Sequence, residues 1–243
     1  MKQALVIGGS NGIGLAISQS LLDRGYGVTV VDRALPDAHI RERVDYVQFD
    51  LTSDDYTLFD RFADSVDVVM ITAGIGQLAL FEHIDETQID RYFHINTIPA
   101  MRLAKRFYHR LLSPADFYFG IMVSIAGFMS SPFFSVYGAT KAALKIFIES
   151  VNVELQKAGS ANRILNVSPG SIQGTHFNGG QANDMDKTQP LADEIVDHLL
   201  NKDDLFIPQY DEVFSHVLER YHRDFRAEGI HSYDYKLASG RVK

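Results

Sequence analysis

Residues 3–14, QALVIGGSNGIG, join a short apolar run to a glycine-rich segment. The apolar run predicts a buried β-strand, and the residues after the glycines predict a helix that ends before Gly25. Gly8, Gly12 and Gly14 lie between these two elements with the spacing GxxxGxG. Glycine lets the backbone turn sharply and approach a pyrophosphate, whose charge the N–H groups of a helix start favour. An ordinary tight turn is the alternative interpretation of the glycines, but their place between a strand and a helix favours the phosphate loop.

The alternation of strand and helix continues along the chain. Further β-rich runs are found at residues 27–32, 44–50, 66–74, 117–127, 163–170 and 204–208. Helical patterns cover about 53–62, 86–111 and a segment that ends near 157. Pro99 is expected either to kink the second of these or to fall near a turn of it. This order predicts an α/β fold, a doubly wound parallel sheet (Rossmann fold) of about seven strands with helices on both faces. Residues 1–243 are expected to form one domain.

Composition excludes several classes of function. The formal net charge is −8 and no basic run is present, which argues against binding to nucleic acid or to an anionic membrane surface. The chain has no cysteine, in keeping with a cytoplasmic protein. Nine histidines are scattered without a metal-binding motif, so no metal site is expected.

Acidic residues follow the second and third predicted strands. Asp32 lies 18 residues after Gly14, where a carboxylate accepts both hydroxyls of an adenosine ribose and repels a 2′-phosphate. This favours NAD over NADP, although Arg33 offers a guanidinium that binds a 2′-phosphate. Asp50 is placed either to bind the adenine amino group or to begin a turn.

The segment 136–144, VYGATKAAL, carries a tyrosine and a lysine in a helical pattern of small and apolar residues. Tyr137 and Lys141 would lie about 6 Å apart along the helix axis, on one face. A nearby ammonium lowers the pKa of a phenol from its usual value of about 10, which allows proton transfer near neutral pH. A core tyrosine beside a lysine that extends to the surface is the alternative interpretation.

The ordered motifs of residues 3–175 resemble those of the short-chain dehydrogenase/reductase family. IGGSNGIG is similar to the family's TGxxxGIG, YGATK to its YxxxK, and PGSIQGT to its PGxxxT with one extra residue. Ser124 precedes Tyr137 by 13 positions, as the family serine does, and Asn96 matches the family asparagine.

This resemblance implies a catalytic group of Asn96, Ser124, Tyr137 and Lys141. Tyr137 would be the general acid or base, and Ser124 would donate a hydrogen bond to the substrate oxygen. Lys141 would lower the pKa of Tyr137 and bind the nicotinamide ribose. Asn96 would hold a water connected to Lys141, or would simply close a helix kink near Pro99.

The resemblance also implies a cofactor site for NAD, with NADP less favoured. Its expected residues are Gly8, Ser10, Asn11, Gly12, Ile13, Gly14, Asp32, Arg33, Asp50, Leu51, Ala73, Gly74, Tyr137, Lys141, Pro169, Gly170, Ile172 and Thr175. The implied activity is hydride transfer between NAD(H) and a small-molecule carbonyl or secondary alcohol. A homodimer or homotetramer would form through the helices near 90–110 and 136–157.

Two other functions compete with this interpretation. A nucleotide-sensing regulator on the same fold would have no turnover, but the presence of both Tyr137 and Lys141 argues against it. A sugar-nucleotide epimerase or dehydratase uses the same pair but resembles a longer chain, and only about 70 residues follow Thr175 here.

Several features remain open at this stage. Ile7 and the segment 71–74, ITAG, depart from the family's threonine and NNAG, which is expected to loosen the hydrogen bonds around the cofactor loop. Residues 171–190 are polar and glycine-rich and are predicted to form a mobile substrate loop. Phenylalanines near Ser124, together with His176 and Phe177, suggest an aromatic-tolerant pocket or ordinary core packing. The polar tail 229–243 has no assignment.

Overall fold

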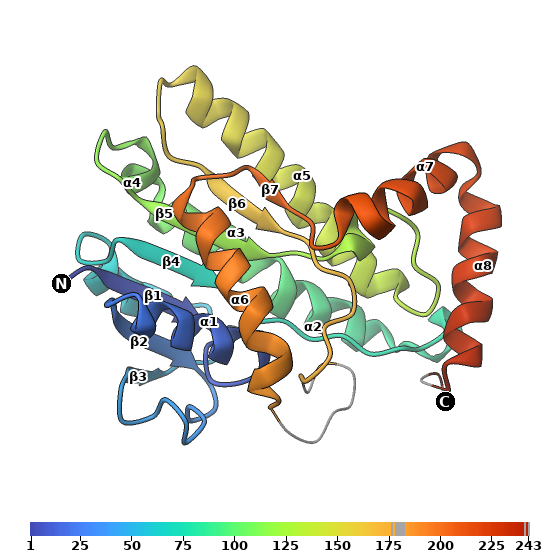
Figure 1. Cartoon of the computed structure of the whole chain (residues 1–243), viewed down its shortest axis with the longest axis horizontal. Coiled ribbons are helices and arrows are strands. Elements are labelled where there is room, and N and C mark those ends of the chain that lie inside the picture. Colours follow the sequence, from blue (N-terminus) through green and yellow to red (C-terminus); the bar gives the residue numbers. More distant parts are fainter. Residues whose placement is uncertain (176, 178–182, 241, 243) are drawn as a thin grey trace.

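The computed structural model describes residues 1–175, 177, 183–240 and 242. In this part of the chain, parallel strands form one sheet of seven with the order β3-β2-β1-β4-β5-β6-β7 (Figure 1). The strands are β1 (Gln3–Ile7), β2 (Gly27–Asp32), β3 (Asp45–Gln48), β4 (Val68–Ile71), β5 (Tyr118–Met122), β6 (Ile164–Val167) and β7 (Leu205–Phe206). The helices are α1 (Gly12–Asp23), α2 (Glu86–Asn96), α3 (Ile98–Arg106), α4 (Tyr108–Leu112), α5 (Ser135–Lys157), α6 (Met185–Leu200), α7 (Ser215–Arg223) and α8 (Phe225–Ala238). The predicted doubly wound parallel sheet is confirmed.

Helices cover both faces of the sheet (Figure 1). Side chains alternate across a strand, so Leu5 and Ile7 enter one core with α3 and α5, whereas Ala4 and Val6 enter the other with α1 and α6. The central strands β1 and β4 are apolar on both faces along most of their length because both faces are buried.

Two predicted helices differ in the structure. The pattern at 86–111 is divided into α2, α3 and α4, with breaks at Thr97 and Phe107. Pro99 lies in the first turn of α3, where its missing N–H would have no partner within the helix, so the proline fits the start of a new helix at the first break. The segment predicted as a helix at 53–62 contains a 3₁₀ helix, Thr57–Phe62, which begins after Asp55 accepts a hydrogen bond from the Thr57 N–H.

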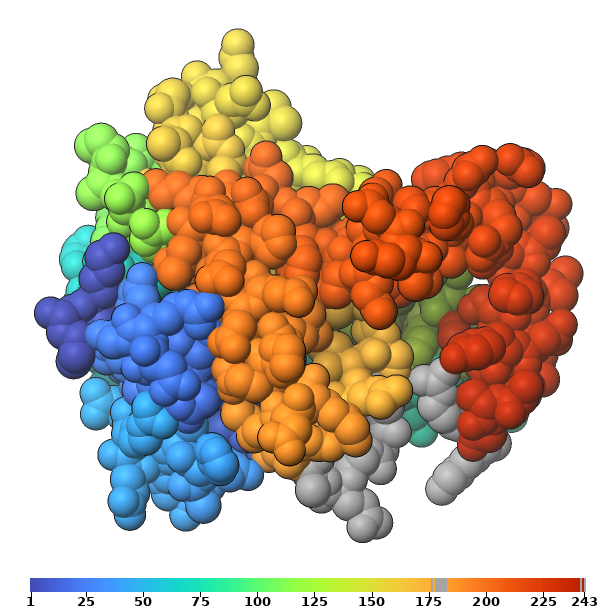
Figure 2. Space-filling model, viewed as in Figure 1, coloured from blue at the N-terminus to red at the C-terminus, as the bar shows by residue number. Residues whose placement is uncertain are grey.

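The C-terminal tail that the sequence left unassigned contains most of α8. This helix projects from the side of the molecule beyond α7 (Figures 1 and 2). Of the predicted substrate loop 171–190, the last residues belong to α6, which begins at Met185, and residues 178–182 lie outside the described part of the chain. His176, one of its expected pocket residues, lies outside the described residues.

Among the residues that the structure describes, no helix is long and apolar enough to cross a membrane. The same residues contain no group of histidines and carboxylates that could hold a metal ion.

Candidate active site

A cavity of about 720 Å³ opens at the carboxyl edge of the sheet. The segments after β1, β2, β3, β4, β5 and β6 all contribute to its wall. The chain leaves β1 toward β2 on one side, and β4 lies on the other side of β1. This reversal of strand order is where doubly wound sheets bind their ligands.

The glycine loop at this edge leaves no room for larger side chains. Gly8 has a φ of +87°, and a Cβ on it would lie 2.5 Å from the Ala73 nitrogen. A Cβ on Gly14 would lie 2.2 Å from the Gly8 oxygen and 2.4 Å from Thr72 Oγ1. The loop therefore packs directly against the end of β4, as a close backbone approach to a phosphate group requires.

Thr72 braces this loop. Its hydroxyl lies 3.1 Å from the Ile7 carbonyl oxygen and 3.0 Å from the Gly8 carbonyl oxygen. The departures at Ile7 and in ITAG therefore do not leave the loop without side-chain support. The threonine of ITAG supplies a hydrogen bond from β4 to the first turn of the loop.

Asp32 ends β2 at one end of the cavity. Its two carboxylate oxygens accept hydrogen bonds from the backbone N–H groups of Ser10 and Ala34, each at 3.2 Å. Arg33 is exposed beside it and also lines the cavity. Asp50 accepts hydrogen bonds from the Thr52 N–H and hydroxyl, at 2.9 and 2.8 Å, so it stabilises a turn while facing the same cavity.

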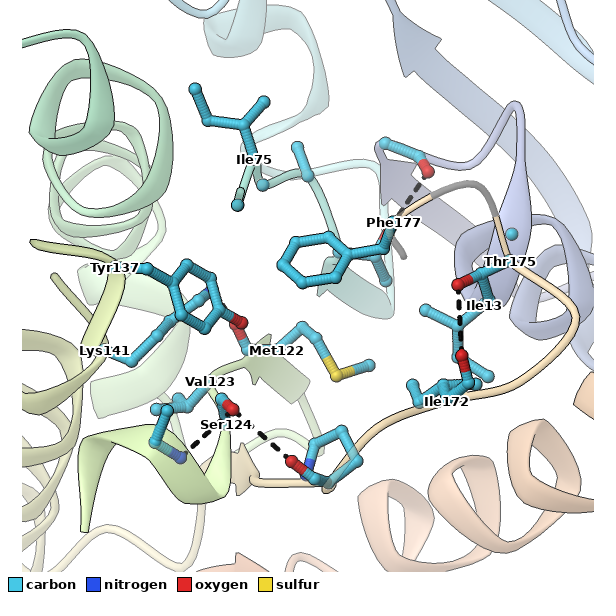
Figure 3. Close-up of a pocket in the computed structure, with 18 of the residues that line it drawn as sticks. Ile13, Ile75, Met122, Val123, Ser124, Tyr137, Lys141, Ile172, Thr175 and Phe177 are labelled. Atoms are coloured by element: carbon cyan, nitrogen blue, oxygen red, sulfur yellow. Dashed lines mark hydrogen bonds between the residues drawn. The ribbon is translucent and has the colours of Figure 1, made fainter. Parts of the chain in front are cut away.

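Ser124, Tyr137 and Lys141 converge on the cavity from β5 and α5 (Figure 3). Ser124 follows β5, and its hydroxyl accepts a hydrogen bond from the Ala126 N–H. Tyr137 and Lys141 stand one turn apart near the start of α5, with Lys141 Nζ 5.7 Å from the centre of the Tyr137 ring. Lys141 Nζ donates a hydrogen bond of 2.8 Å to the Met122 carbonyl oxygen at the end of β5.

Burial controls the protonation of this pair. It raises the pKa of Tyr137 to about 12, against a smaller lowering by a hydrogen bond with Ser124. It also lowers the pKa of Lys141 to about 7. Both pKa shifts favour the neutral form of the side chain, because a buried charge loses its hydration. The sequence predicted that Lys141 lowers the pKa of Tyr137. In the structure the pKa of Tyr137 is raised instead, and Lys141 does not oppose this because it is itself buried and bonded to Met122.

Asn96 lies behind the cavity rather than in its wall. Its amide nitrogen donates to the Ile75 carbonyl oxygen at 2.9 Å and to Thr140 Oγ1 at 3.2 Å, and its oxygen accepts from the Ile75 N–H at 2.8 Å. Asn96 is also the last residue of α2, before the break at Thr97. The position fits the interpretation as a residue that closes a helix kink, and the predicted water site stays a prediction.

The structure brings nearly all the predicted site residues together. Two of them, Ser10 and Asn96, do not line the cavity. Ser10 is fully buried, and its hydroxyl donates to the Ala34 carbonyl oxygen at 2.7 Å, so it holds the loop from behind. The predicted residues that do line the cavity are Gly8, Asn11, Gly12, Ile13, Gly14, Asp32, Arg33, Asp50, Leu51, Ala73, Gly74, Ser124, Tyr137, Lys141, Pro169, Gly170, Ile172 and Thr175.

Sequence reasoning missed two contributions from the C-terminal part of the chain. The Asn183 side chain accepts a hydrogen bond from the Gly12 N–H at 2.8 Å and donates one to Asp37 at 3.0 Å. From α8, Ser232, Tyr235 and Lys236 also line the cavity. No apolar pattern marks these residues, because the inward positions of α8 are mostly polar.

Comparison with known proteins identifies the family. The model of the short chain dehydrogenase family matches residues 2–186. An uncharacterized oxidoreductase, TDA5, of Saccharomyces cerevisiae is 28% identical over 72% of this chain and 56% of its own length. An uncharacterized short-chain type dehydrogenase/reductase, y4eK, of Sinorhizobium fredii is 30% identical over 70% of this chain and 69% of its own length. The chain thus spans little more than half of the yeast relative.

A solved structure agrees with the fold. The short-chain dehydrogenase from Sphingobium yanoikuyae, in complex with NADPH, has a TM-score of 0.73 and 22% identity, over 92% of this chain and 96% of that one. The chain belongs to the short-chain dehydrogenase/reductase family of oxidoreductases.

Proposed function

We propose that this protein transfers hydride between a nicotinamide dinucleotide and a carbonyl or secondary alcohol. The observation that carries the proposal is the convergence of Ser124, Tyr137 and Lys141 on the cavity that the glycine loop also borders. A bound reduced dinucleotide supplies the hydride, and the protein supplies the proton and the hydrogen bonds.

Tyr137 is the proton donor to the substrate oxygen in this proposal. With a pKa of about 12, its hydroxyl is protonated at neutral pH, which is the state that an acid needs. The oxygen of a carbonyl that receives hydride becomes a strongly basic alkoxide and takes this proton. Ser124 donates a hydrogen bond to the same oxygen as its charge develops. These protonation states support carbonyl reduction over alcohol oxidation near pH 7.

The carboxylate at the end of β2 supports NAD(H) over NADP(H). Asp32 faces the cavity next to the glycine loop, where it would accept the ribose hydroxyls and repel a 2′-phosphate. Arg33 is the opposing influence, since its exposed guanidinium lines the cavity beside Asp32 and would bind a 2′-phosphate. Titration of the wild type with NADH and NADPH, followed by fluorescence, is expected to give tighter binding of NADH. Asp32→Ala should then narrow the difference, and Arg33→Ala should widen it.

Turnover separates this proposal from a nucleotide sensor. Tyr137→Phe is expected to lower kcat for ketone reduction by about 100-fold or more while NADH binding changes far less. Tyr92→Phe is the matched control, because Tyr92 is a buried tyrosine of the same apolar cluster that does not line the cavity. Wild-type protein that binds NADH but reduces no ketone would favour the sensor. Equal turnover by wild type and Tyr137→Phe would refute the proton-donor role.

A further inference from the structure

Helix α8 lies against the rest of the molecule along one stripe. Of its residues, the partly shielded ones are Glu228, Gly229, Ser232, Tyr233 and Lys236. The last four have the spacing i, i+3, i+4 and i+7, which places them on one helix face. None of the residues of α8 is fully buried. The helix therefore contributes little to either sheet core, and its position needs another explanation.

Specific contacts hold this stripe to the segment between Ser124 and Tyr137. The rings of Tyr233 and Phe133 stack with centres 4.5 Å apart. Lys236 Nζ donates hydrogen bonds to Ser131 Oγ at 2.7 Å and to the Pro132 carbonyl oxygen at 2.8 Å. A Cβ on Gly229 would lie 3.5 Å from Ser130 Oγ, an ordinary van der Waals distance, so Gly229 faces the Ser130 side chain.

Phe133, which stacks on Tyr233, has a strained backbone conformation. Its φ is +67°, a conformation that costs a residue with a large side chain about 1 kcal/mol or more, yet only 3% of its surface is exposed. Its carbonyl oxygen accepts a hydrogen bond from the Ala79 N–H at 3.0 Å. Burial of the Phe133 ring between α8 and the rest of the molecule compensates this strain.

A second set of contacts fixes the angle between α7 and α8. Arg220 of α7 binds both carboxylate oxygens of Glu228, at 2.7 and 3.2 Å. Asp224 caps α8 by accepting hydrogen bonds from the N–H groups of Arg226 and Ala227. Since α7 is anchored in the body through buried Leu218, these contacts place α8 at the cavity.

The surface that α8 faces is the part of the cavity next to Tyr137. In Figure 2 the molecular surface is hollowed beside α8. The ring centres of Phe134 and Phe177 lie 5.1 and 5.3 Å from that of Tyr137, and Figure 3 shows Phe177 directed toward Tyr137. Tyr235 lies at the mouth with 63% of its surface exposed. Further apolar lining is supplied by Ile75, Leu78, Met129 and Phe214.

We propose that α8 is the outer wall of the substrate site and that this wall selects ketones with a bulky aromatic substituent. The inference rests on the proposed reductase function. A carbonyl oxygen at the Tyr137 hydroxyl places its substituents among the rings of Phe134, Phe177 and Tyr235, where a phenyl group gains edge or stacking contacts. A methyl group in the same place leaves the space unfilled. Tyr235 contacts the substrate, and Tyr233 is a positioning residue that acts through Phe133.

The experiment compares acetophenone with acetone, using NADH-loaded protein and nicotinamide absorbance. For the wild type, kcat/KM for acetophenone should exceed that for acetone by about 100-fold. Tyr235→Ala should lower this ratio about tenfold by removing a ring from the wall. Tyr233→Ala should lower the ratio by a similar factor through loss of the stack, and Tyr233→Phe should restore it because the ring remains.

Phe225→Ala is the matched control on the same helix. Phe225 is a half-exposed aromatic residue that does not line the cavity, so the ratio should stay at the wild-type value. Tyr235→Ala is the variant that should stay folded, since Tyr235 is largely exposed and its truncation removes little buried surface. A ratio that both alanine variants leave unchanged, or a preference for acetone, overturns the role of α8.

Failure of this inference is distinguishable from failure of the proposed function. Absence of NADH binding and of any ketone turnover removes the function itself. Reduction of acetone and acetophenone with a ratio insensitive to Tyr233→Ala and Tyr235→Ala leaves the reductase intact and removes only the substrate wall.

Discussion

Lys141 carries its amino group into the interior of the protein, where only 2% of the residue is exposed. Burial lowers its pKa from 10.5 to about 7. From about pH 7 toward 10.5 the unfolded chain therefore holds a proton that the folded protein has released. Stability rises with pH wherever the unfolded state binds more protons, so the free energy of unfolding should increase across this window.

Substitution of the lysine tests this dependence. Relative to Lys141→Met, the wild type should gain stability as pH rises from about 7, by at most about 1.4 kcal/mol per pH unit. Below about pH 7 the lysine is protonated in both states and the difference should be constant. Tyr137 does not affect this comparison below pH 10. Its pKa is raised from 10.0 to about 12, so the stability that its protonated form contributes is lost only above pH 10.

Urea denaturation at several pH values provides the measurement. Lys145→Met is the control, since Lys145 lies one turn further along α5 and pairs at the surface with Glu149. A stability difference between wild type and Lys141→Met that does not change with pH would show that Lys141 is charged throughout, contrary to the effect of its burial.

That Ser124, Tyr137 and Lys141 lie at one cavity could be predicted because their spacing is local. Tyr137 and Lys141 lie one turn apart on any helix, and Ser124 follows a strand that the apolar pattern reveals. Their pKa values could not be predicted, because burial depends on what α5 packs against. The sequence shows an amine beside a phenol, but the direction of the Lys141 amine toward the Met122 carbonyl oxygen is a property of the folded chain.

At the scale of elements, Asn96 joins three parts of the fold. It ends α2, its side chain pairs with both backbone groups of Ile75 after β4, and it reaches Thr140 of α5. Asn96→Ala would leave the N–H and carbonyl of Ile75, a partly buried residue, without these partners. Such losses cost about 1–3 kcal/mol, so the free energy of unfolding should fall by that amount.

Chemical denaturation of Asn96→Ala checks this prediction. Asn201→Ala is the control, because Asn201 is an exposed asparagine that likewise follows the end of a helix, α6, and should change stability by no more than about 0.5 kcal/mol. If the two variants lose equally little stability, the hydrogen bonds of Asn96 do not support the segment after β4.

Strands were the elements that the sequence predicted best, since buried parallel strands are apolar along their whole length. The helices were harder. Pro99 was recognised as a kink, but a full break at Thr97 also depends on the side chain of Asn96 binding another segment. Helix α8 escaped prediction because its inward stripe contains Gly229, Ser232 and Lys236, which give no hydrophobic period.

At the scale of the whole molecule, helix α5 has apolar side chains that remain exposed at the surface. Ile146 and Val153 are 59% and 60% exposed, and their separation of seven residues places them on one face of the helix. The resemblance to the family implied assembly through this helix and the preceding one. We therefore expect two copies of the chain to pack with these faces together, because an exposed apolar patch of this kind favours association.

Sedimentation velocity tests the expected assembly. The wild type should sediment as a dimer or a larger oligomer at micromolar concentration, and Ile146→Asp with Val153→Asp should weaken association by about 100-fold or more, because a carboxylate buried in an apolar interface loses its hydration. Ile230→Asp is the control, since Ile230 is a similarly exposed apolar residue on α8, 63% exposed, outside this helix. A monomeric wild type, or an equal loss of assembly in Ile230→Asp, would show that α5 is not the interface. The folded state should persist in the double variant, because neither side chain contributes to the sheet cores.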